Sequence, residues 1–414
     1  MNMPRICDIC TYAGAFCVYQ MEMDMVFTDA YIFQGEKGFI KGSFRVSGDR
    51  IQEILEEGGK IPDDPAGNKN AGKADQEQEI SLNGAYVLPG LVDIHTHGNS
   101  GYDFSDGSAE GLESIGKYMA SHGITSFLPT SMTLPYDRLE AAFQTAAGYM
   151  KNPPDDGARV LGVHMEGPYF SEKKKGAQNS AYLKLPDTEG FRELQEKCGG
   201  IIRIVDVAPE LDGAEEFVRA AAEISRVSAA HTDASYEDAA RAFDAGASHV
   251  THLFNAMPPI HHRRPGVIGA GCERENVYAE LICDGLHVHP SVIRMAFKLF
   301  PGRICLISDS LRCCGMPEGV YELGGQSITL KDGQARIADG NLAGAVANLY
   351  EDLVNAIHFG IKVEDAITAA TLTPAREAGM DDEVGSLDAG KKADFLVCDP
   401  QWNLQQVYIG GQEV

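Results

Sequence analysis

The middle of the chain alternates apolar, strand-like runs with amphipathic, helix-like stretches, and this alternation constrains the fold more than any other feature. The runs with the composition of buried strands are 86–95, 124–130, 160–166, 201–207, 226–231, 249–252, 278–284 and 304–309. The helix-like stretches are 108–121, 136–150, 214–224, 236–245, 290–300 and, after the last run, 345–359. Eight such units predict an α/β fold, a (β/α)8 TIM-like barrel. A doubly wound parallel sheet is the alternative.

The two ends of the chain differ from the middle. Short strand-like runs with glycine turns occupy residues 25–87 and return in residues 385–414. We therefore expect a small β-sandwich domain formed from both termini, with barrel residues 88–384 inserted between its halves. Residues 59–79 are polar and contain Pro and Gly, which predicts a surface loop. Residues 1–24 are expected to be an extra, disordered N-terminal segment.

Composition narrows the class of partner. The net charge of −25 argues against nucleic acid and anionic membranes, and no run approaches the 18 apolar residues of a membrane span. A phosphorylated substrate would need a local cationic cluster, and residues 261–264 (His-His-Arg-Arg) stand out as one.

The ten cysteines are scattered, mostly in apolar runs, as expected of free thiols in the cytoplasm. Cys7 and Cys10 have the spacing of half a zinc motif, but no second pair stands at a useful distance.

The first strand-like run ends at two histidines, His95 and His97. Residues i and i+2 of a strand point to the same side, so both imidazoles can converge on one object. Such a pair is typical of a metal site, the alternative being two exposed polar residues that close a strand.

The ends of the other runs favour the metal. They carry further ligand-type residues: Glu166, His231, His252, Asp284 with His287 just beyond, and Asp309. In a barrel all these ends face one mouth, where the active site lies. Nitrogen and oxygen donors suit Zn²⁺, Fe²⁺ or Mn²⁺, and their number leaves room for two ions bridged by Glu166.

The remaining histidines are expected to play other parts. His164 shares the face of Glu166 and is predicted to support the site, while His249 is predicted to pack. Three more lie in or beside helices and are expected to be structural or solvated: His122, His289 and His358.

Asp309 is the most informative carboxylate, because it ends the apolar run 304–308. The alternative role is a helix N-cap. The chain has no G-x-S-x-G sequence, so metal-activated water is a better mechanism than a serine nucleophile.

These patterns belong to longer motifs. They are PGLVDIHTHG (89–98), GVHMEGPYF (162–170), KKGAQN (174–179), AAHTDAS (229–235), THLFNAMPP (251–259), RRPG (263–266), CDGLHVHP (283–290), LISDS (306–310), NLAGA (341–345) and GSLDAGKKADFLV (385–397). In this order they resemble the amidohydrolase superfamily and, within it, the N-acetylglucosamine-6-phosphate deacetylases. The resemblance covers nearly the whole chain after residue 25.

The resemblance implies roles for individual residues. Glu166, His231 and His252 are similar to the family's core metal ligands, and His95 and His97 match the pair found in its two-metal members. Asp309 matches the catalytic acid/base and is also a candidate ligand. The positions that match substrate contacts are Ala177, Gln178, Asn255, Ala256, Arg263, His287, Leu342, Ala343 and Gly344.

Two of these positions carry further implications. Some members have histidine where this chain has Gln178, and a second metal is consistent with that exchange. The family's equivalent of Arg263 reaches the sugar phosphate of the neighbouring subunit, which implies a homodimer.

The implied reaction is hydrolysis of the acetamide of N-acetyl-D-glucosamine 6-phosphate to D-glucosamine 6-phosphate and acetate, in amino-sugar catabolism. The implied cofactor is one or two divalent ions, zinc first, with iron, manganese, cobalt and nickel open.

Three alternatives remain. One is a deacetylase for the galactosamine epimer. Another is a different amidohydrolase, although residues 204–210 lack the lysine of many cyclic-amide hydrolases. The third is a catalytically silent sugar-phosphate-binding protein, which would be expected to have lost a ligand or Asp309.

Overall fold

The computed structural model describes residues 24–57 and 78–414. The predictions for the N-terminal segment, for Cys7 and Cys10 and for nearly all of the 59–79 loop lie outside the described residues.

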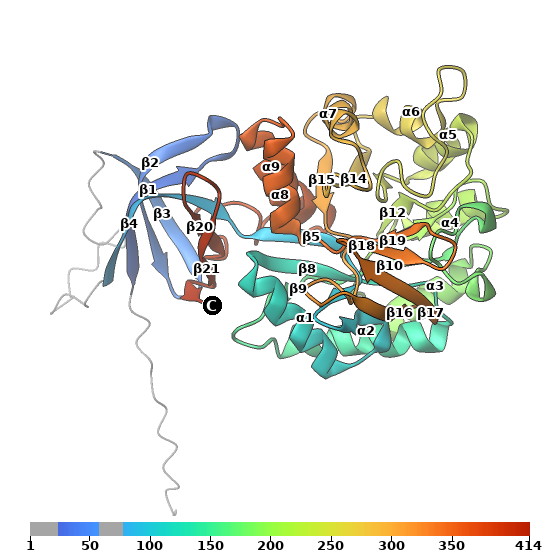
Figure 1. Cartoon of the computed structure of the whole chain (residues 1–414), viewed down its shortest axis with the longest axis horizontal. Coiled ribbons are helices and arrows are strands. Elements are labelled where there is room, and N and C mark those ends of the chain that lie inside the picture. The colour runs from blue at the N-terminus through green and yellow to red at the C-terminus, as the bar shows by residue number, and fades with distance from the viewer. Residues whose placement is uncertain (1–23, 58–77) are drawn as a thin grey trace, which may run out of the picture.

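A parallel barrel occupies the larger part of the molecule (Figure 1). Its strands, in order, are β5 (Leu91–Thr96), β8 (Ile124–Ser131), β10 (Val163–Tyr169), β11 (Ile202–Val207), β12 (Arg226–Ala229), β13 (His249–Val250), β14 (Tyr278–Ile282) and β15 (Ile304–Ile307). A short strand, β9 (Arg159–Val160), pairs with β8. The backbone N–H of Asp309 donates to the carbonyl of His95 at 2.9 Å, and that of His97 donates to Ser310 at 2.9 Å, so β15 and β5 close the ring. The predicted barrel is confirmed, and the doubly wound sheet is excluded.

Helices cover the outside of the barrel. They are α1 (Ala109–Ser121), α2 (Tyr136–Lys151), α3 (Thr188–Lys197), α4 (Ala214–Ala221), α5 (Tyr236–Ala245), α6 (Gly266–Cys272), α7 (Pro290–Leu299), α8 (Leu349–His358), α9 (Val363–Ala370) and α10 (Leu372–Glu377). The six predicted stretches are helical, whereas α3, α6, α9 and α10 were not predicted. Glycine-rich α6 has low intrinsic helix propensity, and six of its seven residues are buried. Tertiary packing, more than local preference, therefore stabilises it.

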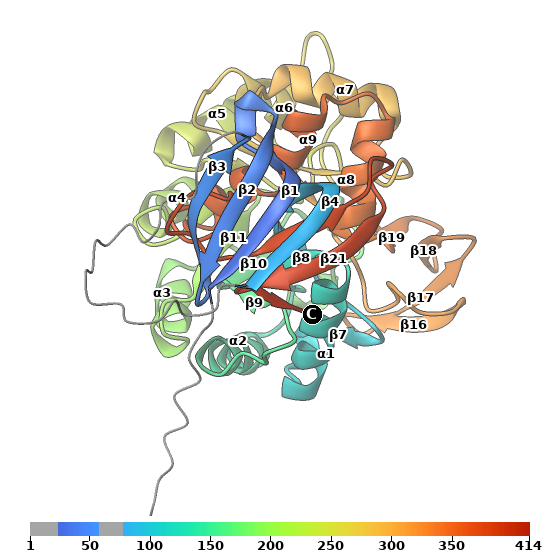
Figure 2. The ribbon, with the colours of Figure 1, turned by 90° about the vertical axis from the view of Figure 1, so that its left-hand side faces the viewer.

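The two ends of the chain meet in one seven-stranded sheet (Figure 2). Its strands, across the sheet, are β22 (Gln412–Glu413), β21 (Leu404–Ile409), β20 (Phe395–Cys398), β4 (Gln78–Pro89), β1 (Met25–Phe33), β2 (Phe39–Ser47) and β3 (Arg50–Glu56). The ring of Phe27 lies 4.9 Å from Phe44 and 5.0 Å from Phe395. Aromatic contacts thus join the N-terminal and C-terminal strands.

The predicted strand 86–95 is wrong as a single element. The chain leaves the terminal sheet at Pro89, passes Gly90 and enters the barrel at Leu91. A Cβ atom at Gly90 would lie 2.1 Å from Oγ1 of Thr125, so a side chain does not fit at this crossing. Because the run is apolar throughout, the sequence gives no signal that the chain changes sheets at Gly90.

A four-stranded antiparallel sheet between β15 and α8 was not predicted. It consists of β16 (Gly319–Leu323), β17 (Gln326–Lys331), β18 (Gln334–Ile337) and β19 (Leu342–Gly344). A small hairpin, β6 (Gly98–Asn99) with β7 (Tyr102–Asp103), follows β5. Strand β19 carries three of the predicted substrate positions.

The interior of the barrel is charged as well as apolar. The fully buried polar residues on its strands include Asp93, His164, Asp206, His249 and Glu280.

Over the described residues, no helix combines the length and the apolar character needed to cross a membrane.

Candidate metal centre and active site

The side chains of the predicted site come from the ends of the barrel strands. His95 lies on β5 and Glu166 on β10, while His231, His252 and Asp309 each lie two residues beyond the end of a strand. These last three have positive φ angles of 44°, 31° and 49°. Such angles are uncommon outside glycine and cluster at functional sites, because the surrounding structure must hold them.

Three donor atoms converge at the first candidate metal group. Oε1 of Glu166 lies 3.1 Å from Nε2 of His231 and 3.1 Å from Nε2 of His252, and the two nitrogens are 3.1 Å apart. Two imidazoles and a carboxylate in this arrangement are suited to a divalent cation.

His95, His97 and Asp309 form a second group. Oδ1 of Asp309 lies 3.3 Å from Nε2 of His97 and 3.6 Å from Nε2 of His95. Glu166 stands between the groups, with Oε2 3.5 Å from His97 and Oε1 3.6 Å from His95. Within the described part of the chain, Nε2 of His95 is buried without a hydrogen-bond partner. The donor set and this orphaned nitrogen fit a bound ion.

The opposite ring nitrogens hold three of the four imidazoles in place, whereas Nδ1 of His252 is buried without a hydrogen-bond partner among the described residues. Nδ1 of His231 lies 2.9 Å from the carbonyl of Lys174, and Nδ1 of His97 lies 3.1 Å from that of Thr130. A carbonyl only accepts, so each Nδ1 carries the proton and Nε2 is left for the centre. His95 uses the carboxylate of Glu280 instead, at 2.8 Å.

Without a metal, protons and carboxylates neutralise each other here. Burial disfavours the imidazolium, but the hydrogen bond to Asp309 and the charge of Glu166 outweigh it and raise the pKa of His97 to about 10. Burial is likewise overcome by Glu166, which raises the pKa of His252 to about 9. Burial also opposes the charge on Glu166, yet the hydrogen bonds from His231 and His252 hold its pKa well below the usual range. A metal would replace protons on the imidazoles.

His164 and His249 lie below the centre, inside the barrel. Nε2 of His164 lies 2.9 Å from Asp206, and its Nδ1 lies 3.0 Å from the carbonyl of Ile94. Both nitrogens face acceptors, which leaves neither for a metal and agrees with a supporting role.

His249 was predicted to pack, and it does more than that. Its Nδ1 lies 2.7 Å from Glu377 and its Nε2 lies 3.2 Å from Glu280, both carboxylates. Burial is overcome by these acids, and the pKa of His249 rises to about 9. Sequence reasoning missed Glu280, whose only signal is an acid inside the apolar run of β14.

A cavity of about 550 Å³ opens above both groups. Its lining contains eight of the nine predicted substrate positions: Ala177, Gln178, Asn255, Ala256, His287, Leu342, Ala343 and Gly344. Lys173, Lys174 and Lys175 also line it and were not predicted. Arg263 is exposed and is not among the described residues that line the cavity of its own chain.

Gln178 and Asp284 are engaged within the protein. The amide nitrogen of Gln178 donates to Oε2 of Glu166, and its oxygen accepts the backbone N–H of Thr133 at 2.8 Å. Asp284, one of the strand-end candidates, does not join the metal groups of the described residues. It accepts from Nδ1 of His287 at 2.6 Å and so leaves Nε2 of His287 for the cavity.

The three helix-associated histidines lie as predicted. His122 caps the C-terminus of α1, His289 caps the N-terminus of α7, and His358 is the last residue of α8.

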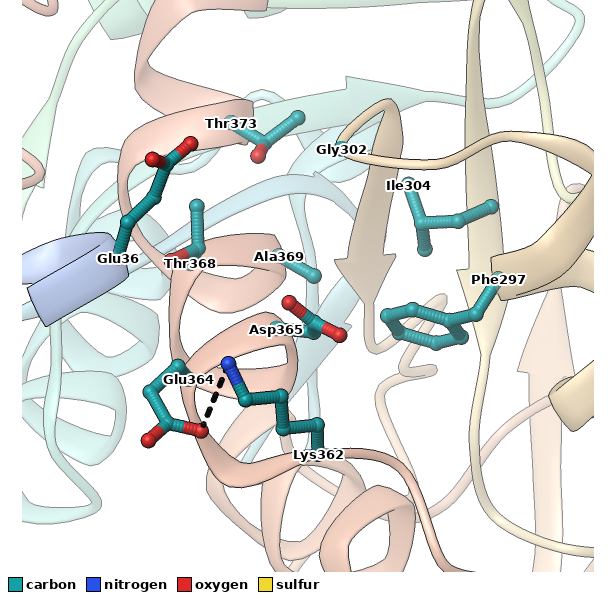
Figure 3. Close-up of a pocket in the computed structure, with 10 residues that line it drawn as sticks. All are labelled: Glu36, Phe297, Gly302, Ile304, Lys362, Glu364, Asp365, Thr368, Ala369 and Thr373. Atoms are coloured by element: carbon teal, nitrogen blue, oxygen red, sulfur yellow. Dashed lines mark ion pairs between the residues drawn. The ribbon is translucent and has the colours of Figure 1, made fainter. Parts of the chain in front are cut away.

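A separate hollow of about 420 Å³ lies at the start of β15, away from the centre (Figure 3). Glu36, Glu364 and Asp365 line it, and Nζ of Lys362 lies 3.6 Å from Glu364. None of the candidate metal ligands lines this hollow. The convergence of histidines and carboxylates distinguishes the larger cavity as the candidate active site.

The family model described as "Amidohydrolase family" matches residues 86–414, which include every ligand named above. The chain belongs to the amidohydrolase family. It is 38% identical to N-acetylglucosamine-6-phosphate deacetylase of Bacillus subtilis (strain 168) over 317 residues, which cover 75% of this chain and 80% of the relative.

Two further proteins resemble this amidohydrolase. N-acetylgalactosamine-6-phosphate deacetylase of Escherichia coli O157:H7 is 35% identical over 328 residues, covering 79% of this chain and 87% of the relative. A mutant N-acetyl-D-glucosamine-6-phosphate deacetylase of Mycobacterium smegmatis, solved with N-acetyl-D-glucosamine-6-phosphate, superposes with a TM-score of 0.83 at 28% identity. That superposition covers 95% of this chain and 99% of the other.

Proposed function

We propose that this amidohydrolase hydrolyses the acetamide of N-acetyl-D-glucosamine 6-phosphate to D-glucosamine 6-phosphate and acetate. The observation that carries the proposal is the position of Asp309, a carboxylate that belongs to the second candidate metal group and lines the 550 Å³ cavity. The B. subtilis relative and the substrate-bound M. smegmatis structure support this choice of substrate.

The reaction needs a proton taken from water and returned to nitrogen. Glu166, His231 and His252 would hold one divalent ion, and His95, His97 and Asp309 would hold a second, with Glu166 shared. Such an ion supplies Lewis acidity and lowers the pKa of water. Asp309 accepts a proton from the attacking water as the new C–O bond forms. It then gives that proton to the sugar nitrogen as the C–N bond breaks, serving first as base and then as acid.

The phosphate end of the substrate requires positive charge in a protein of net charge −25. We propose that Arg263 of the partner subunit supplies this charge in a homodimer. Arg263 is exposed and lies outside the lining of its own cavity. Exposed apolar side chains lie near Arg263 and His287 in sequence: Ile260 is 44% exposed and Leu286 is 49% exposed. Exposed apolar residues of this kind are typical of an interface.

We propose zinc as the ion, because imidazole and carboxylate donors with an open position are typical of catalytic zinc. Iron, manganese, cobalt and nickel also accept this donor set. The described cysteines are free thiols, mostly buried, which supports a reducing, cytoplasmic location.

The galactosamine epimer is the second candidate substrate. It is favoured by the 35% identity to the E. coli enzyme named for that sugar phosphate. A silent binding protein is disfavoured, because the six predicted metal ligands, Asp309 among them, are present and converge.

Acetate release from a panel of N-acetyl amino sugars tests the proposal. We expect the highest kcat/KM for N-acetyl-D-glucosamine 6-phosphate, a lower value for its galactosamine epimer, and far less with unphosphorylated sugars. Elemental analysis of protein purified without chelator identifies the metal. Faster turnover of the epimer would favour the second candidate, and no acetate from any substrate by the metal-loaded protein would refute deacetylation.

A further inference from the structure

Glu280 links the two candidate metal groups from below. It lies on β14 and is fully buried. Its Oε2 accepts from Nδ1 of His95 at 2.8 Å and from the backbone N–H of His252 at 3.0 Å. Its Oε1 lies 3.2 Å from Nε2 of His249. One carboxylate therefore contacts a candidate ligand of each group.

The contact with His95 differs from its counterparts. His97 and His231 donate Nδ1–H to backbone carbonyls, which are neutral. His95 donates to an ionised side chain, and such charge-assisted bonds are roughly twice as strong as neutral ones. The bond fixes the tautomer and the ring plane, so that the unpartnered Nε2 of His95 faces Glu166 and Asp309.

The charge of Glu280 is balanced within the barrel. His249 bridges Glu280 to Glu377, and Glu377 pairs with Nε of Arg226 at 3.3 Å. This chain of ion pairs runs from a half-exposed arginine to His95. The partners of Glu280 donate and both oxygens of its carboxylate accept, so each of these contacts is satisfied.

We propose that Glu280 is a positioning residue that holds His95 ready for the second ion of the centre. This inference rests on the proposed metal site and deepens it. Outer partners of this kind contribute 10- to 100-fold in metal affinity. Removing Glu280 should therefore weaken binding of the ion that His95 holds, and should weaken much less the binding of the ion held by Glu166, His231 and His252.

The substitution Glu280→Gln tests this with little change of shape. An amide oxygen facing His95 would keep that hydrogen bond without its charge, and the NH₂ group would face Nε2 of His249, which accepts only if His249 is neutral. Glu377→Gln is the matched control: it removes an equally buried charge from the same chain of ion pairs but does not contact His95.

The measurement is a Zn²⁺ titration of chelator-stripped protein by calorimetry, with metal content checked by elemental analysis. We expect two ions in the unsubstituted protein and in Glu377→Gln. In Glu280→Gln the first ion should bind within about threefold of the unsubstituted affinity, and the second at least tenfold more weakly. If Glu280→Gln does not fold, Glu280→Asp, which withdraws the carboxylate from His95, should show the same selective loss.

Three results would overturn the inference: equal weakening of both ions, unchanged binding of both, or a single ion in the unsubstituted protein. Each is read without substrate, so failure of this inference is separable from failure of the deacetylase proposal, which is read from acetate release.

Discussion

Asp309→Asn is the substitution that tests the proposed chemistry most directly. Asp309 has φ of 49°, its N–H donates to His95, and its carbonyl accepts from Ala345 at 2.9 Å. Asparagine tolerates this left-handed backbone about as well as aspartate, whereas alanine would add strain on the order of 1 kcal/mol or more. The asparagine variant therefore keeps the fold and removes the charge and the proton-accepting oxygen.

The size of the effect follows from the role of the carboxylate. General acid–base catalysis contributes about 10²- to 10⁴-fold, which corresponds to about 3 to 5 kcal/mol of transition-state stabilisation. Because Asp309 moves a proton only during the reaction, we expect kcat to fall by this factor and KM to change little. Oδ1 lies 3.3 Å from His97, so the second ion should also bind more weakly.

The assay is acetate release at saturating metal, with metal content and thermal unfolding measured on the same protein. Asp339→Asn is the control, because Asp339 lines the cavity but belongs to neither metal group. It should keep kcat near that of the unsubstituted protein. The reasoning would be refuted if Asp309→Asn at saturating metal kept kcat within tenfold of the unsubstituted value, since Asp309 would then act only as a ligand.

Four further predictions concern binding and stability. Arg263→Ala should raise KM at least tenfold for the phosphorylated sugar and little for the unphosphorylated one; Arg264→Ala is the control, and equal effects on both sugars would contradict the phosphate role. If the site is shared between subunits, mixing inactive Asp309→Asn with Arg263→Ala should yield hybrid dimers with one intact site, so failure of exchanged subunits to regain activity would argue against sharing. Chelation should lower Tm by several degrees, reversibly on adding metal, because a ligand at 1,000 times its Kd stabilises by about 4 kcal/mol; an unchanged Tm would contradict tight binding. Because the pKa of His249 is raised to about 9, its stabilisation is complete below the unfolded value of about 6.5 and is lost as pH rises through 9. His249 accounts for at most about 3 kcal/mol of the loss in metal-stripped protein, to which His97 and His252, whose pKa values are also raised, add their own shares. Urea unfolding over this pH window should show the loss, and Glu377→Gln should lessen it.

Several features of this protein follow from local sequence alone. Apolar runs that alternate with amphipathic stretches determine the barrel, because each unit must bury one face against the next. The histidines and acids that end those runs also indicate the centre, since the ends of parallel strands meet at one mouth. His95, His97, Glu166, His231 and Asp309 could therefore be placed at one site before any contact between them was known.

Other features depend on contacts between residues far apart in sequence. The change of sheet at Gly90 depends on Thr125 lying against it, and the run itself carries no break. The short strands β16–β19 bring Ala343 to the cavity only because they pair with one another beside the barrel mouth. Glu280 looked like one acid in an apolar strand. Only the closed barrel brings it to His95, 185 residues away, where its buried carboxylate accepts a hydrogen bond from the imidazole Nδ1.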